Sequence, residues 1–149
     1  GVGSVFFDKP QSFDLGISFA KTFTTDENFS LTLQYGSTDW GSASDGGDDF
    51  EYDKISFGAE YEITKKILFF RKTALRAGYY QSSASGDTNI WEWPDVTGIT
   101  FGLGLSFGDI SDENRDYFQF DLAQELRKLE NDDYSDDASL TTVSFSWFF

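Results

Sequence analysis

Large apolar residues alternate with small or polar residues along most of this chain. In residues 11–23, nearly every odd position is large and apolar, whereas the even positions are mostly small or polar. The same period of two recurs in six further segments and, more weakly, in residues 1–7; the six are 28–38, 54–63, 73–80, 98–108, 118–127 and 142–149. Because successive side chains of a strand point to opposite faces, this pattern predicts about eight β-strands and no helix.

The connections between these segments alternate in length. Short connections follow residues 11–23, 54–63 and 98–108, and long polar connections follow the other three segments, including the stretch LENDDYSDDAS at 129–139. In an up-and-down meander, alternate connections lie at the same end of the sheet. Short turns at one end and long loops at the other are typical of outer-membrane barrels. The pattern therefore predicts acidic extracellular loops and a periplasmic C-terminus.

The alternation defines two faces, and packing limits favour one assignment of them. A filled eight-stranded soluble barrel holds about a dozen inward side chains, whereas about thirty large apolar residues share one face here. A two-sheet sandwich is the soluble alternative that could bury this much apolar surface. Turning the apolar face toward lipid removes the packing problem. We therefore expect an all-β, antiparallel, up-and-down transmembrane β-barrel that forms a single domain over residues 1–149.

The opposite face then lines the barrel interior and carries charged residues of both signs. An unpaired charge in such a place is costly, so these side chains are expected to pair. Either a pore lining or gate, or a structural network that fills the lumen, fits this face. The predicted lumen-facing residues are Asp14, Lys54, Glu60, Glu62, Arg76, Asp121, Glu125 and Arg127.

Composition removes several classes of function. The chain has a formal net charge of −15, and a polyanion repels phosphate backbones, so no nucleic-acid partner is expected. It contains no Cys and no His, which excludes thiolate metal sites, His-ligated zinc and His-based catalysis. Carboxylate pairs without a nucleophile give little support to an enzyme. We expect no enzymatic activity, no catalytic residues and no cofactor.

Two clusters of carboxylates lie outside the clearest strands. Clustered carboxylates can hold Ca²⁺, but neither cluster has the spacing of an EF-hand, so solvated loops without a metal site are the favoured interpretation. The clusters are Asp45, Asp48, Asp49, Glu51 and Asp53, and Asp132, Asp133, Asp136 and Asp137.

Trp and Tyr residues fall near several predicted strand ends. Such residues favour the membrane–water interface, so they predict an aromatic girdle, with core aromatics as the alternative in a sandwich. The residues are Trp40, Tyr79, Tyr80, Trp91, Trp93 and Trp147.

The last seven residues, VSFSWFF, resemble the C-terminal signature of outer-membrane barrels. That signature is an alternation of apolar residues ending in an aromatic, and Val143, Phe145, Trp147 and Phe149 fill it. In those proteins the barrel assembly machinery reads the signature. The resemblance implies the same partner and contact with outer-membrane lipid.

A second resemblance covers about two thirds of the chain. PQSFDLGISFAKTFTTDENFSLTLQYGSTDW is similar to a hairpin of FadL-type long-chain fatty acid transporters, and TALRAGYY followed by GITFGLGLSFG is similar to a later hairpin. The family has a fourteen-stranded barrel with an N-terminal plug. Neither the plug nor the first strands has a counterpart here, so no substrate-handling residue is carried over.

Two functions follow from these expectations. In the first, the chain is the C-terminal half of a FadL-like barrel that passes a hydrophobic ligand across the outer membrane. In the second, it is a complete eight-stranded barrel that acts as a structural anchor or surface-interaction protein.

Overall fold

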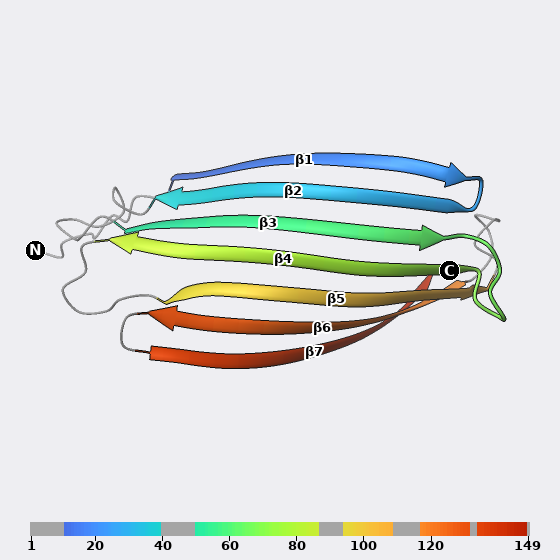
Figure 1. The fold of residues 1–149 in the computed structure, drawn as a ribbon. Coiled ribbons are helices and arrows are strands. Elements are labelled where there is room, and N and C mark those ends of the chain that lie inside the picture. Colours follow the sequence, from blue (N-terminus) through green and yellow to red (C-terminus); the bar gives the residue numbers. More distant parts are fainter. Residues whose placement is uncertain (1–10, 40–49, 87–93, 109–116, 132–133, 149) are drawn as a thin grey trace, which may run out of the picture.

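The fold is a seven-stranded antiparallel sheet in which each strand pairs with its neighbours in the sequence (Figure 1). The computed structural model describes residues 11–39, 50–86, 94–108, 117–131 and 134–148. The strands are β1 (Gln11–Thr24), β2 (Glu27–Asp39), β3 (Phe50–Ile63), β4 (Lys72–Gly86), β5 (Asp95–Gly108), β6 (Tyr117–Asn131) and β7 (Tyr134–Phe148). The predicted all-β, up-and-down antiparallel architecture is confirmed.

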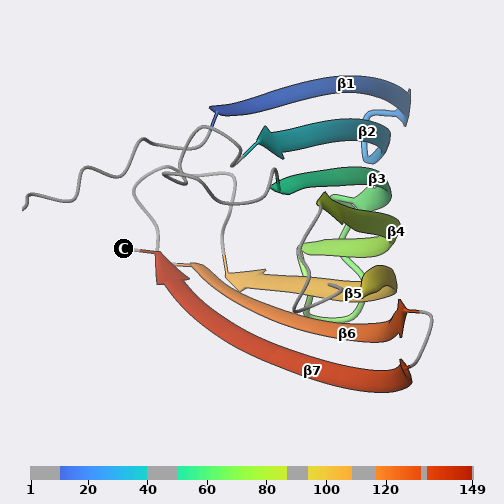
Figure 2. The same ribbon diagram turned by 90° about the vertical axis from the view of Figure 1, so that its left-hand side faces the viewer.

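The sheet is coiled rather than flat. Figure 2 shows β1 at one rim and β7 at the other, with the central strands set back between them. All strands of the described residues belong to this one sheet, so the second layer of a sandwich is not found among them. Within the described residues β1 and β7 are the two edges, and they do not pair with each other.

Strand ends differ from the prediction most clearly near the C-terminus. The expected long loop at 129–139 is wrong, because β6 continues to Asn131 and β7 begins at Tyr134, and these two residues are paired. Lys128 lies opposite Asp137 in this extended hairpin, so opposite charges meet across the two strands and favour pairing. The expected strand at 1–7 lies outside the described residues.

The lengths of the connections also differ from the expected alternation. Counted between strand bounds, 2, 8 and 8 residues separate β1 from β2, β3 from β4 and β5 from β6, and 10, 8 and 2 residues separate β2 from β3, β4 from β5 and β6 from β7. Each end therefore has one two-residue connection and two longer ones. The expected contrast between short turns at one end and long loops at the other is wrong.

The two faces of the sheet have different exposure. The buried side chains Ala74, Ser82 and Ser106 share one face, which we call the polar face. Most of the exposed large apolar side chains lie on the other, which we call the apolar face; Ile17 there is 70% exposed and Phe145 is 62% exposed. Crowding of side chains on the polar face indicates that it is the inner side of the curve. Among the described residues, no helix has the length and apolar character needed to cross a membrane.

Candidate functional site

The eight charged residues predicted to line a lumen all lie on the polar face. Asp14 comes from β1; Lys54, Glu60 and Glu62 come from β3; Arg76 comes from β4; Asp121, Glu125 and Arg127 come from β6. The alternation of the sequence was enough to place them together. Their partners depend on the strand register, which the pattern alone does not supply.

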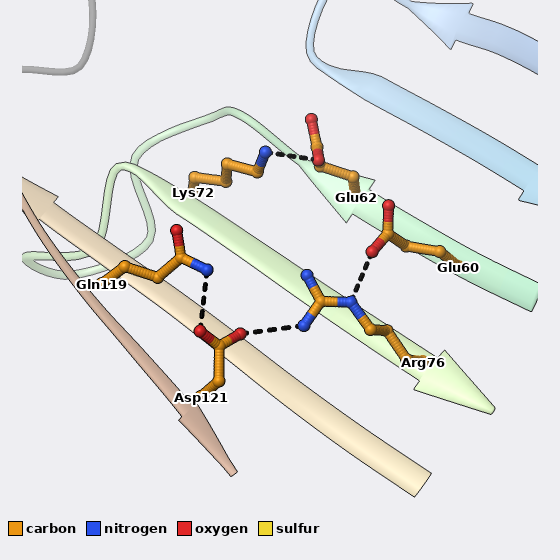
Figure 3. A network of polar contacts seen from close by, with 6 residues as sticks. All are labelled: Glu60, Glu62, Lys72, Arg76, Gln119 and Asp121. Carbon is orange, nitrogen blue, oxygen red and sulfur yellow. Dashed lines mark hydrogen bonds and ion pairs between the residues drawn. The ribbon is translucent and has the colours of Figure 1, made fainter. Parts of the chain in front are cut away.

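The first group of contacts centres on Arg76 (Figure 3). Its guanidinium forms an ion pair with Glu60 on β3 and donates from Nη1 to Asp121 Oδ1 on β6 over 2.9 Å. Gln119 donates to the other oxygen of Asp121 over 2.7 Å. Lys72 Nζ lies 2.6 Å from Glu62 Oε2 beside them. Arg76 thus joins β3, β4 and β6 across the polar face.

The second group centres on Tyr80, nearer the other end of the sheet. The Tyr80 hydroxyl donates to Glu125 Oε1 over 2.6 Å and accepts from Arg127 Nε over 3.0 Å. Arg127 Nη2 also lies 2.7 Å from the same Glu125 oxygen. Lys54 Nζ lies 5.1 Å from the centre of the Tyr80 ring, at the distance of a cation–π contact.

Glycines of β5 let both groups cross that strand. A Cβ built on Gly98 would overlap the Tyr80 ring, and one built on Gly104 would lie 2.8 Å from Asp121 Oδ1. With hydrogen in place of a side chain, β5 leaves room for Arg76 and Tyr80 on β4 to reach β6. These contacts therefore depend on the small residues between their ends.

Three network residues were absent from the predicted set, namely Lys72, Tyr80 and Gln119. All three lie on the polar face, so the alternation contained the signal for their orientation. Tyr80 was instead assigned to an aromatic girdle, and that assignment is wrong, because its hydroxyl bonds within the polar network. Tyr79, one position earlier, does lie on the apolar face, where it is 43% exposed.

The apolar face carries a belt of large apolar side chains. The belt covers residues 13–23 in β1, 29–35 in β2, 55–63 in β3, 75–79 in β4, 99–107 in β5, 118–126 in β6 and 143–147 in β7. Two polar residues interrupt it. Gln124 bonds Ser139 and Thr141, each over 2.6 Å, and Lys21 lies 5.2 Å from the Phe23 ring centre.

Aromatic residues mark both borders of this apolar belt. The Tyr35 hydroxyl donates to Asp53 over 2.7 Å, so its ring lies in the belt and its polar end lies beyond it. At the opposite border, Trp147 stacks on Phe118 with 5.8 Å between ring centres. The other predicted girdle residues, Trp40, Trp91 and Trp93, lie outside the described residues.

The acidic clusters are only partly described. Glu51 and Asp53 lie on β3, and Asp136 and Asp137 lie on β7, while the remaining cluster residues lie outside the described ranges. Within those ranges, no group of three or more acidic side chains is arranged to hold a metal ion.

Comparison of the chain with protein-family models, with curated proteins and with solved structures finds no match.

Proposed function

We propose that this chain forms the wall of a transmembrane β-barrel in the outer membrane, with its apolar face against lipid and its polar face toward the lumen. The observation that carries this proposal is the slope of the apolar belt across the strands. Leu33 on β2 connects through successive paired residues to Leu126 on β6 and then to Ser139 on β7, which lies outside the belt. Another paired row begins at Glu27, outside the belt, and ends at Phe145, inside it.

The slope has a size that can be compared with known barrels. The midpoint of the belt moves by about five residues between β1 and β7, which at ~3.3 Å per residue and ~4.8 Å per strand gives an angle of roughly 30°. Strands of membrane barrels tilt by about 35–45° from the membrane normal. A horizontal layer of lipid would cross tilted strands along such a sloping line, so the belt fits strands inclined in a bilayer.

The sheet edges also bear on the proposal. In hydrocarbon, each unpaired backbone group costs several kcal/mol, so β1 and β7 would need strand partners in the membrane. We propose that the barrel assembly machinery brings about this closure and recognises Val143, Phe145 and Trp147, which share the apolar face of β7. The fourth signature residue, Phe149, lies outside the described residues.

The passage of hydrophobic small molecules is the finer proposal, and the FadL-like hairpins support it. An anchor or interaction protein built on eight strands is the second proposal, and the polar network supports it, since its paired charges would fill part of the interior of a closed barrel. Neither of these two proposals depends on the lengths of the connections between strands. The periplasmic C-terminus and extracellular acidic residues are proposed from the C-terminal signature alone.

The first test is a gel of the native protein extracted in detergent, run heated and unheated, together with its intact mass. A heat-modifiable band is expected, because closed barrels resist detergent until heated. A mass near that of this chain, 16.8 kDa, would support the eight-stranded anchor, and a mass two to three times larger would support the wider barrel. Two results together would contradict the membrane proposal: the band does not shift on heating, and the protein does not float with lipid vesicles in a density gradient.

A further inference from the structure

The polar face contains an open hollow between the two groups of contacts. Its volume is about 420 Å³, within the range of small-molecule sites, which is about 300–1,000 Å³. Its floor consists of small residues, because Gly58 on β3 and Gly78 on β4 lie side by side there. The hydroxyl groups of Ser30, Thr32, Ser56 and Thr100 surround them.

Charged residues border the hollow on both sides, and they differ in their partners. Arg76 and Glu60 lie at one border and are paired with each other. Lys54 lies at the other border, where its ammonium group lies over the Tyr80 ring and its charge acts on the Glu125 carboxylate. On the described part of the polar face, Lys72, Arg76 and Arg127 each form an ion pair with a carboxylate, and Lys54 does not.

We propose that this hollow binds a small hydrophilic anion, such as a polyhydroxylated carboxylate, with the carboxylate against Lys54 and its hydroxyl groups against the hydroxyl-lined floor. Three carboxylates surround Lys54 without forming an ion pair with it: Glu60 is bonded to Arg76, Glu125 is bonded to Arg127, and Asp14 lies over Gly36 in the same paired row as Lys54. The Tyr80 ring lies so close to Gly98 that a Cβ built there would overlap it. A charge-assisted hydrogen bond and several neutral ones would then orient the anion.

This inference goes beyond the proposed membrane wall, because it assigns a hydrophilic solute to a defined place on the lumen side. It rests on the proposed function only in placing the hollow inside a barrel. The hollow itself is a feature of the sheet face and is testable in the detergent-solubilised full chain.

Gluconate and sorbitol form a suitable pair of probes, since they differ mainly by a carboxylate in place of a hydroxymethyl group. Binding is measured by saturation-transfer NMR titration of the full chain in detergent. We expect saturable gluconate binding and at least about tenfold weaker sorbitol binding, the factor expected for a charge-assisted hydrogen bond.

Two substitutions test the position of the site. Gly58→Leu should abolish gluconate binding, because a Cβ on Gly58 meets no atom within 4 Å and the added side chain would fill the hollow without displacing its neighbours. Lys54→Met should weaken binding about tenfold or more. The matched controls are Gly16→Leu, on the polar face of β1 and outside the hollow, and Lys72→Met, which removes a paired cation; neither should change the affinity.

The outcomes separate this inference from the membrane proposal. Equal binding of gluconate and sorbitol, or a gluconate affinity unchanged by Gly58→Leu and Lys54→Met, would overturn the anion site. Absence of gluconate binding in protein with a heat-modifiable band would overturn the site and leave the barrel standing. If gluconate binding is weakened by both substitutions but the protein has no heat-modifiable band, the anion site stands and the barrel proposal is overturned.

Discussion

The two faces of the sheet are built by different rules. On the apolar face, side chains such as Phe57 and Ile99 need only be large and apolar, and they are about half exposed. On the polar face, Arg76 and Tyr80 reach partners on β6 across the glycines of β5. The apolar face should therefore accept any large apolar side chain. The polar face depends on individual residues and on the strand register. Four predictions test this difference.

The largest effect is expected from a charge placed in the apolar belt. Leu33→Arg should destabilise the protein in lipid vesicles by about 2–4 kcal/mol, and Ser139→Arg by about 0–1 kcal/mol, because depth in the bilayer sets the cost of an arginine. Both residues belong to the same row of paired residues, so their place in the sheet is comparable. Denaturant unfolding in vesicles measures both free energies. Equal costs would show that the belt does not follow the lipid boundary.

The next effect concerns space on the polar face. Gly98→Val should cost about 1–3 kcal/mol, because the new side chain overlaps the Tyr80 ring. In a protein that already carries Tyr80→Ala, the Gly98→Val substitution should cost much less, and a double-mutant cycle measures this difference. Gly16→Val is the control, since a Cβ there has Leu33 O as its nearest atom at 3.8 Å. If the free-energy costs of Tyr80→Ala and Gly98→Val were additive, contact with the Tyr80 ring would not be the cause of the Gly98→Val destabilisation.

Loss of the central cation should have a smaller effect. Arg76→Met leaves Glu60 and Asp121 without their shared partner and should cost about 1–2 kcal/mol, a value between those of exposed and buried ion pairs. Lys128→Met removes a more exposed pair with Glu130 and should cost clearly less than Arg76→Met. Unfolding free energies of the two variants give the comparison. Identical losses would mean that the network adds nothing beyond a surface pair.

The smallest effect is expected for an apolar exchange on the apolar face. Under the proposed placement against lipid, Phe57→Leu should change stability by less than about 0.5 kcal/mol, since lipid chains would fill the space left by the smaller side chain and leave no fixed cavity. The measurement is again denaturant unfolding in vesicles. A loss above about 2 kcal/mol would instead indicate close packing of Phe57 against protein, as in the core of a sandwich.

The comparison of faces also explains what the sequence could predict. The period of two assigned residues to faces correctly across all seven described strands, because the direction of a side chain depends only on its position in its own strand. It therefore placed Asp14 and Arg127 on one face although they are far apart in the chain. It could not show that Arg76 contacts Asp121, because that contact depends on the register of three strands and on the absence of side chains on β5.

Strand ends were less predictable for a related reason. Residues 129–139 contain only two large apolar or aromatic side chains, Leu129 and Tyr134, and their many carboxylates suggest a solvated loop. In the structure the flanking residues form paired strands, with Lys128 opposite Asp137 and Asn131 opposite Tyr134. Cross-strand complementarity of this kind appears only when two segments are compared in register.

The number of strands in the sheet restricts how it can close. Strand direction alternates across the sheet, so the seventh strand runs the same way as the first. Direct joining of these edges, either within one sheet or between two copies that cross the membrane in the same orientation, would create a parallel pair in an otherwise antiparallel wall. An antiparallel barrel therefore requires an odd number of additional strands. One additional strand gives eight and seven additional strands give fourteen, so both proposed barrels satisfy the parity rule, and a barrel made only of two such sheets in the same orientation does not.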